Sequence, residues 1–245
     1  MATKRAVLLD YGHTLVNLVR PETHILDAYR AINQRLEQEL EREVPEAAEL
    51  IKRVSIAVDD AIGDSYRTGA EQEVDIVELY RDALASLDIE IHPETLQWVI
   101  DQEQTAWFNG IVPSRHAPGV LATLRERGLK LCIVSNAAFP PKSMRDQLRH
   151  IGLWDYFDAT VYSSELGVRK PNRAIYEEAL RLLGAQPEEA VFVGDRLRED
   201  VRGPRNVGIQ ALLTHEFRKE EPTWWGIDVE VLTSLADLPK AIDAS

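Results

Sequence analysis

The sequence of 245 residues contains a single cysteine, Cys132, so it cannot form an internal disulfide bond. Cys132 falls within the apolar run 129–134, where we expect it to be a buried, small hydrophobic side chain. The six histidines are scattered and show no paired spacing typical of a metal site. Neither thiolate chemistry nor a zinc site is therefore expected, and cysteine usage gives no support for secretion.

Long apolar runs and an excess of positive charge are also missing. No stretch approaches the roughly 18 apolar residues that suggest a membrane span, and the apolar run near the N-terminus stops at Asp10, too early for a signal peptide. The 28 Lys and Arg against 41 Asp and Glu give a net charge of −13. Because nucleic acids and anionic membranes attract positive surfaces, we expect neither as a partner. We expect a cytoplasmic protein; the sequence does not indicate its oligomeric state.

Short apolar runs and helical patterns alternate after Pro113, which predicts an α/β fold with a parallel sheet. The expected strands are 6–9, 129–134, 159–162, 190–193, 210–213 and 229–232. Residues 21–104 differ, because Glu, Arg, Ala and Leu recur there at helical spacing and no strand pattern is visible. Pro204 leaves open whether the helix after position 200 starts late or is kinked.

Polar residues follow three of the expected strands. Asp10 follows 6–9, Ser135 and Asn136 follow 129–134, and Asp195 follows 190–193. Because open parallel sheets bind ligands beyond the carboxyl ends of their strands, we expect these side chains to converge if the strands are neighbours. Taken singly, each has a plain structural interpretation, such as a helix cap.

Together these residues favour chemistry on a phosphorylated substrate. A carboxylate at position 10 can attack phosphorus if a metal and a cation neutralise the phosphoryl oxygens. Lys170, fixed by Pro171, supplies a cation, although a loop lysine is more often simply solvated. Asp195 and Asp200, five residues apart, can serve Mg²⁺, which prefers oxygen ligands.

In order and position, these residues resemble the motifs of the haloacid dehalogenase superfamily. Those motifs run Asp-x-Asp-Gly-Thr-Leu, then Ser or Thr, then Lys-Pro, then Gly-Asp-x-x-x-x-Asp. The sequence matches them at Asp10, Thr14, Leu15, Ser135, Asn136, Lys170, Pro171, Gly194, Asp195 and Asp200. The resemblance implies a Rossmann-like α/β core formed by 1–16 and 113–245, with an α-helical cap inserted at 17–112.

The same resemblance implies a role for each matching residue. Asp10 would be the nucleophile, and the phosphoryl group would be bound by Ser135, Asn136, Lys170 and Thr14. Asp10, the backbone carbonyl of Gly12, Asp195 and Asp200 would form the Mg²⁺ site. The implied activity is that of a Mg²⁺-dependent phosphatase acting on a small phosphorylated metabolite through an aspartyl-phosphate intermediate.

The first motif departs from the family pattern, because Gly12 replaces the second Asp, which acts as general acid and base. His13 replaces the Gly that follows it. Three interpretations remain open. In the first, the protein is a phosphatase in which His13 or a cap residue transfers the proton. In the second, it cleaves phosphonates, and Lys52, the one lysine of the cap, forms a Schiff base. In the third, it is a catalytically weak binding or regulatory module. Retained Asp195 and Asp200 argue against a haloacid dehalogenase, which needs no Mg²⁺.

We expect the cap to close over the sheet edge by hinges near 15–20 and 110–114. The aromatic candidates for its inner face are Trp98, Trp107 and Phe108, although we expect at least two of them to pack in the core of the cap. Possible substrate anchors are Arg20, Arg67 and Arg115, among which the sequence does not choose.

Overall fold

The computed structural model describes residues 3–243 and contains a six-stranded sheet in which every neighbouring pair is parallel. The strand order is β5-β4-β1-β6-β7-β8, with β1 in the interior of the sheet. The strands are Ala6–Leu9 (β1), Lys130–Ser135 (β4), Ala159–Tyr162 (β5), Ala190–Gly194 (β6), Gln210–Thr214 (β7) and Val231–Leu232 (β8). The predicted α/β class is confirmed, while the last strand is shorter than the expected 229–232.

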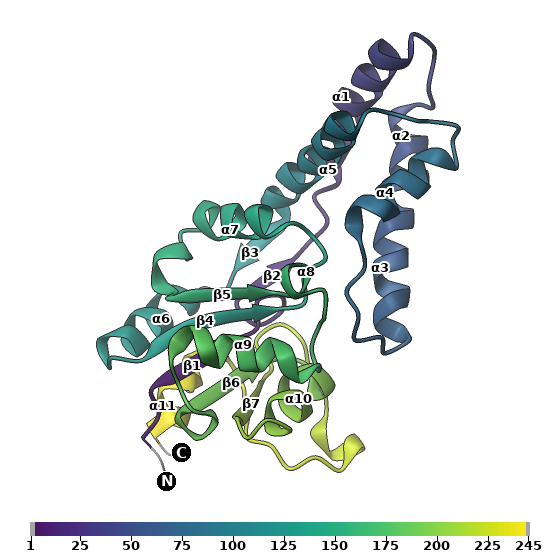
Figure 1. Cartoon of the computed structure of the whole chain (residues 1–245). Helices are drawn as coiled ribbons and strands as arrows, with labels where there is room; N and C mark the ends of the chain where they lie inside the picture. The colour runs from purple at the N-terminus through teal and green to yellow at the C-terminus, as the bar shows by residue number, and fades with distance from the viewer. Residues whose placement is uncertain (1–2, 244–245) are drawn as a thin grey trace.

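Helices cover both faces of this sheet, and its two middle strands, β1 and β6, are apolar throughout. On β1, Val7 and Leu9 pack in one hydrophobic cluster, whereas Ala6 and Leu8 pack in another on the opposite face. This alternation follows from the period of two in a strand, and it explains why β1 carries no polar position. The flanking helices are α6 (Ala117–Glu126), α7 (Pro141–His150) and α11 (Leu238–Asp243) on the first face, and α9 (Arg173–Leu183) on the second (Figure 1).

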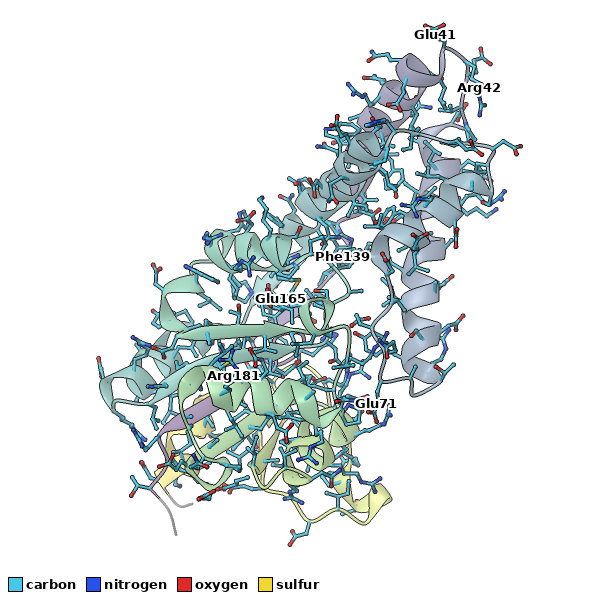
Figure 2. The ribbon with its side chains drawn as sticks, viewed as in Figure 1. Glu41, Arg42, Glu71, Phe139, Glu165 and Arg181 are labelled. Atoms are coloured by element: carbon cyan, nitrogen blue, oxygen red, sulfur yellow. The ribbon has the colours of Figure 1, made fainter. Side chains whose placement is uncertain are left out.

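A helical insertion, defined as α1 to α5, leaves the α/β part between two short strands, β2 (Val16–Leu18) and β3 (Ile111–Pro113). Its members are α1 (Glu22–Leu40), α2 (Ala47–Leu50), a π-helical segment (Ile51–Ile56), α3 (Ala57–Arg67), α4 (Ile76–Ala85) and α5 (Pro93–Trp107). The insertion has its own hydrophobic cluster, centred on buried residues such as Ile25, Tyr29 and Val99. Figure 2 shows Glu41 and Arg42 at its tip, far from the sheet, and Glu71 at its other end.

Two backbone pairings among the described residues attach the insertion to the α/β part. One is the antiparallel ribbon of β2 and β3, where the amide of Val19 donates to Gly110 O at 2.8 Å. The other is a backbone pairing of 71–73 with 167–169, which includes a bridge between Gln72 and Val168. A buried ion pair of 2.8 Å between Arg169 and Glu73 reinforces this second contact.

The remaining short elements shape the loops around the sheet edge. They include α8 (Ser163–Leu166), a π-helical segment (Leu197–Arg202), α10 (Gly203–Arg205) and 3₁₀ turns at Phe108–Gly110, Trp154–Tyr156, Pro187–Glu189, Pro222–Trp225 and Leu235–Asp237. The helix before Pro204 does not start late; it begins at Leu197, and its wider π turn precedes the proline, which lacks an N–H donor. Among the described residues, no helix is both long and apolar enough to cross a lipid bilayer.

Candidate active site

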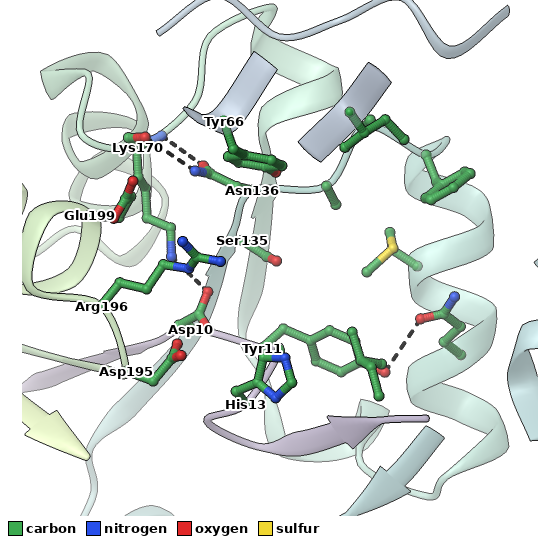
Figure 3. Close-up of a pocket in the computed structure, with 18 of the residues that line it drawn as sticks. Asp10, Tyr11, His13, Tyr66, Ser135, Asn136, Lys170, Asp195, Arg196 and Glu199 are labelled. Atoms are coloured by element: carbon green, nitrogen blue, oxygen red, sulfur yellow. Dashed lines mark hydrogen bonds and ion pairs between the residues drawn. The ribbon is translucent and has the colours of Figure 1, made fainter. Parts of the chain in front are cut away.

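The expected site residues meet at the carboxyl edge of the sheet, where β4, β1 and β6 are neighbours. Asp10 follows β1, Ser135 ends β4 and Asp195 follows β6, and all three side chains are buried. Because neighbouring parallel strands end at the same edge, three loops that are distant in sequence lie together. Figure 3 shows these side chains around one space.

Lys170 is the central cation of the site, although only 2% of its surface is exposed. Its Nζ donates to Asp10 Oδ1 at 2.6 Å and to Asp200 Oδ1 at 2.7 Å. Burial alone would lower the pKa of Lys170, but the two carboxylates outweigh it and raise that pKa above its usual value. The lysine is therefore a permanent positive charge that holds two acidic side chains.

Asp200 organises the loop after β6. Its Oδ2 accepts hydrogen bonds from the backbone amides of Asp195 at 3.1 Å and Arg196 at 2.9 Å, while its Oδ1 accepts from Lys170. A Cβ atom at Gly194 would collide with the Asp200 carboxyl group, so glycine is required there for this close approach. The Gly-Asp pair at the end of β6 is thus explained by packing as well as by chemistry.

The three carboxylates form a group suited to a hard cation. Asp10, Asp195 and Asp200 each offer an oxygen, and these oxygens lie within 4.8 Å of one another. Asp195 Oδ2 is buried and accepts no hydrogen bond from the described residues, although Arg218 Nη1 lies 2.9 Å away as an ion pair. Burial, and next the charges of Asp10 and Asp200, raise the pKa of Asp195 to about 8. A buried, all-oxygen set of three clustered carboxylates fits Mg²⁺.

The other matching residues are placed around Asp10 and Lys170. Thr14 Oγ1 donates to Asp10 Oδ2 at 3.3 Å. Asn136 uses both ends of its amide on the backbone of Lys170, at 2.7 Å to the N–H and 3.1 Å to the carbonyl. The side chain of Asn136 therefore positions Lys170, whereas Ser135 lines the open space itself.

The loop from Asp10 to Leu15 carries the departure from the family pattern. The φ of Gly12 does not lie in the left-handed region, whereas His13 adopts a φ of 60°. His13 lines the cavity, and its pKa is lowered by burial and, to a smaller extent, by Arg218 and Arg196. A neutral imidazole is therefore present at pH 7, close to the carboxylate group.

A cavity of about 330 Å³ opens from this edge of the sheet toward the helical insertion. The insertion contributes one carboxylate, one amide and apolar or aromatic side chains to its lining: Asp59, Gln104, Ile62, Tyr66 and Trp107. Burial, and next Glu103, raise the pKa of Asp59 to about 6. The ring of Tyr66 is covered by two arginine side chains of the α/β part, with Arg169 at 4.4 Å and Arg196 at 6.0 Å from its centroid.

Several aromatic and basic candidates from the sequence lie elsewhere. Trp107 lines the cavity, but Trp98 packs in the core of the insertion and Phe108 packs against the α/β core, 5.4 Å from the His150 ring. Trp107 also packs against the core of the insertion, so two of the three aromatics contact that core, as expected, and Phe108 does not. None of the three arginine candidates, Arg20, Arg67 and Arg115, lines the cavity.

The phosphonate interpretation required a lysine from the insertion in the site. Lys52 is exposed on the π-helical segment and does not line the cavity, so it is not placed to form a Schiff base there. The cavity residues that sequence reasoning missed are Asp59, Tyr66, Gln104, Arg196 and Arg218. For Gln104 a signal existed, because it continues the buried stripe Leu96, Val99, Ile100 of α5 as a polar residue.

Comparison with known proteins places this geometry in a family. The model of the haloacid dehalogenase-like hydrolases matches residues 4–208. A glyceraldehyde 3-phosphate phosphatase of Methanopyrus kandleri is 30% identical over 84% of this chain and 81% of its own length. A phosphoserine phosphatase of Thermus thermophilus is 37% identical, but over only 43% of this chain and 42% of its own. A 2-haloacid dehalogenase of Pseudomonas syringae superposes with a TM-score of 0.69 at 20% identity, over 99% of both chains, and shares the fold. The chain belongs to the haloacid dehalogenase-like hydrolase family.

Proposed function

We propose that the protein is a Mg²⁺-dependent phosphatase that hydrolyses a small phosphorylated metabolite through an aspartyl phosphate on Asp10. The observation that carries this proposal is the setting of Asp10, whose carboxylate lies between Lys170 Nζ and Thr14 Oγ1 at the cavity edge. A buried carboxylate held by a cation beside an acidic metal-type group is the arrangement that nucleophilic attack on phosphorus needs.

Asp10, the carbonyl of Gly12 and Asp195 would hold the Mg²⁺, which neutralises phosphoryl oxygens when bound. Asp200 contributes by a different route, because its Oδ2 accepts hydrogen bonds from two backbone amides of the loop after β6, those of Asp195 and Arg196. We therefore assign Asp200 to positioning the loop that presents Asp195, rather than to direct coordination.

In the first step Asp10 attacks phosphorus, an O–P bond to the carboxylate forms, and the ester O–P bond breaks. The departing alkoxide takes up a proton and leaves as an alcohol. In the second step water attacks the aspartyl phosphate and releases inorganic phosphate, giving its proton to a base. Lys170 offsets the negative charge on Asp10 and the phosphoryl oxygens, and Ser135 lies where its hydroxyl can donate to the phosphoryl group.

The proton transfers are the weak part of this machinery. At the position that carries the acid–base Asp in the family pattern, Gly12 has no side chain, and the imidazole of His13 is the neighbouring titratable group in the cavity. Because its pKa is lowered, His13 is mainly neutral at pH 7, and the neutral imidazole can accept a proton but not donate one to the leaving oxygen as an imidazolium would. We infer that esters with good leaving groups, which need little protonation, are hydrolysed faster than alkyl phosphates.

The helical insertion serves as the cap in this proposal. Residues 1–16 and 113–245 form the core, and residues 17–112 form the cap. The separate hydrophobic cluster of the insertion and its contribution to the cavity lining support that division. Closure of the insertion over the site would exclude water other than the attacking molecule.

The test is phosphate release from a panel of phosphorylated metabolites and 4-nitrophenyl phosphate, with and without Mg²⁺. Asp10→Asn should abolish release while the far-ultraviolet circular dichroism spectrum stays unchanged. Asp155→Asn, which changes an exposed aspartate of the α/β part, is the matched control and should behave as the wild type. Turnover that survives Asp10→Asn would rule out the mechanism, and Mg²⁺ binding without turnover on any ester would favour a binding module.

A further inference from the structure

The positive charges of the cavity are confined to the end near Asp10. Lys170, Arg196 and Arg218 are the lysine and arginine side chains among its described lining residues, and all three come from the α/β part. Figure 3 shows Lys170 and Arg196 beside Asp10. Lys170 is bound to Asp10 and Asp200, and Arg218 is paired with Asp195. Arg196 lies 6.0 Å from the centroid of the Tyr66 ring, and the described part of the helical insertion adds no lysine or arginine to the cavity lining.

The end of the cavity formed by the helical insertion is instead acidic and apolar. Asp59 is the charged residue that the described part of the insertion adds to the lining. Arg20 lies behind it, bound to Asp59 at 2.7 Å and to Ser55 at 2.7 Å, so this arginine is already paired. A substrate carboxylate placed here would lose its hydration and face Asp59 without a counter-charge, which is costly.

One polar side chain at this end has no partner. Gln104 is 3% exposed and lines the cavity, yet its amide makes no hydrogen bond with any described residue, and its Nε2 is fully buried. The adjacent Glu103 shows the contrast, because it accepts hydrogen bonds from Tyr29, Tyr80 and Ser55. An amide left unpaired in a cavity wall costs free energy unless a ligand satisfies it.

Gln147, on α7, adds a second amide to the cavity lining. Its Oε1 accepts from the Tyr11 hydroxyl at 3.4 Å, and its Nε2 has no bond with a described residue. The wall around the two amides is apolar or aromatic, with Ile62, Phe139 and Met144. An amide offers one donor and one acceptor function, which match a hydroxyl or a carbonyl group and do not compensate a full charge.

We propose that the site selects phosphate monoesters whose organic part is uncharged and carries a hydroxyl or carbonyl oxygen, and that Gln104 is the specificity-determining residue that binds this oxygen. This inference rests on the proposed phosphatase function. It disfavours phosphate esters whose organic part places a carboxylate at the end of the cavity formed by the helical insertion.

The first experiment compares glycerol 3-phosphate with 3-phosphoglycerate, which replaces the terminal hydroxymethyl group by a carboxylate. We expect kcat/KM for glycerol 3-phosphate to be greater by at least about 100-fold, because the carboxylate is desolvated without a cation. Ile62→Lys, which adds a cation to the half-buried wall, should narrow this ratio by about tenfold or more. Equal kcat/KM values in the wild type would overturn the inference.

The second experiment tests Gln104 itself with glycerol 3-phosphate and propyl phosphate, which lacks both hydroxyl groups. Gln104→Leu should lower kcat/KM for glycerol 3-phosphate about 5- to 10-fold more than for propyl phosphate, the value of one hydrogen bond. Gln97→Leu changes an exposed glutamine on the same helix and should leave the ratio unchanged. An equal loss on both esters would make Gln104 a structural residue and refute its role.

Hydrolysis of 4-nitrophenyl phosphate separates the two proposals. Suppose that the wild type hydrolyses this ester, that Asp10→Asn abolishes the activity, and that the wild type nevertheless prefers 3-phosphoglycerate. This result would support the phosphatase function and refute the proposed selectivity. Wild-type protein that hydrolyses none of the esters with Mg²⁺ present would refute both.

Discussion

Replacing Gly12 by Asp should convert the protein into a faster phosphatase. The structure has room for the new side chain, because a Cβ atom at position 12 has Leu18 Cδ1, at 3.6 Å, as its nearest neighbour. The φ of Gly12 is outside the left-handed region, so the substitution causes no backbone strain there. The carboxyl group would enter the cavity beside Asp10, where a leaving oxygen must receive a proton.

General acid–base help contributes about 10²–10⁴-fold in rate. We expect the lower end, about 10²-fold or about 2.7 kcal/mol of barrier, because three carboxylates already lie in the site and oppose a fourth. The assay is kcat/KM for glycerol 3-phosphate and for 4-nitrophenyl phosphate. The gain should be large for the alkyl ester and below about tenfold for the aryl ester, whose leaving group needs little protonation.

The control is Gly12→Asn, which has nearly the same shape but cannot exchange a proton at neutral pH. If Gly12→Asn gave the same gain as Gly12→Asp, the effect would come from packing rather than proton transfer. A folded Gly12→Asp protein with unchanged alkyl phosphatase activity would refute the view that the missing acid limits the rate.

Three further predictions concern the supporting residues. Gly194→Ala should displace Asp200 and lower kcat at least about tenfold. The control is Gly119→Ala, whose added Cβ has no neighbour within 4 Å and which should leave both activity and the urea midpoint close to those of the wild type. A fully active Gly194→Ala protein would contradict the packing argument. Lys170→Met should lower the free energy of unfolding of the metal-free protein by about 3–5 kcal/mol, because it leaves the buried carboxylates of Asp10 and Asp200 without a counter-charge. Urea denaturation measures this change. An unchanged urea midpoint would show that other groups balance the charge of these carboxylates. The pKa of Asp59 is raised from 3.8 to about 6 in the folded protein, so its ionisation removes stability as pH rises through about 6. The Tm of Asp59→Asn should therefore fall less than the Tm of the wild type between pH 4 and pH 7.5. Parallel Tm profiles of the two proteins would refute this prediction.

The α/β part could be predicted from the sequence because its signals are local. A fully buried parallel strand is a short apolar run, and the residue after it marks the functional edge, so Asp10, Ser135 and Asp195 could be found without a structure. Their neighbours in the sheet could be inferred only from the family resemblance, since strand order is a long-range property. Lys170 lies in a loop, and its burial against Asp10 and Asp200 has no local signal.

The insertion side of the cavity was largely missed because helical periodicity shows which face is buried but not what that face contacts. Asp59 and Tyr66 lie on α3, about two turns apart, and nothing in their spacing separates a cavity wall from a helix interface. Arg20, Arg67 and Arg115 were candidate substrate anchors because of their charge alone. In the fold, Arg20 is paired with Asp59 and Arg67 with Asp64. A charge pattern does not reveal whether a partner is already present.

The interior place of β1 has a consequence for how the chain folds. Ala6 to Leu9 must pair with 130–133 on one side and with 190–193 on the other, so both contacts close loops of more than a hundred residues. Such closures are entropically costly and slow, whereas the helices of the insertion meet through nearer contacts. During synthesis the first strand must therefore wait for β6, and we expect the insertion to become compact while the sheet is still incomplete. Asp10, the proposed nucleophile, would be made early and reach its final surroundings late.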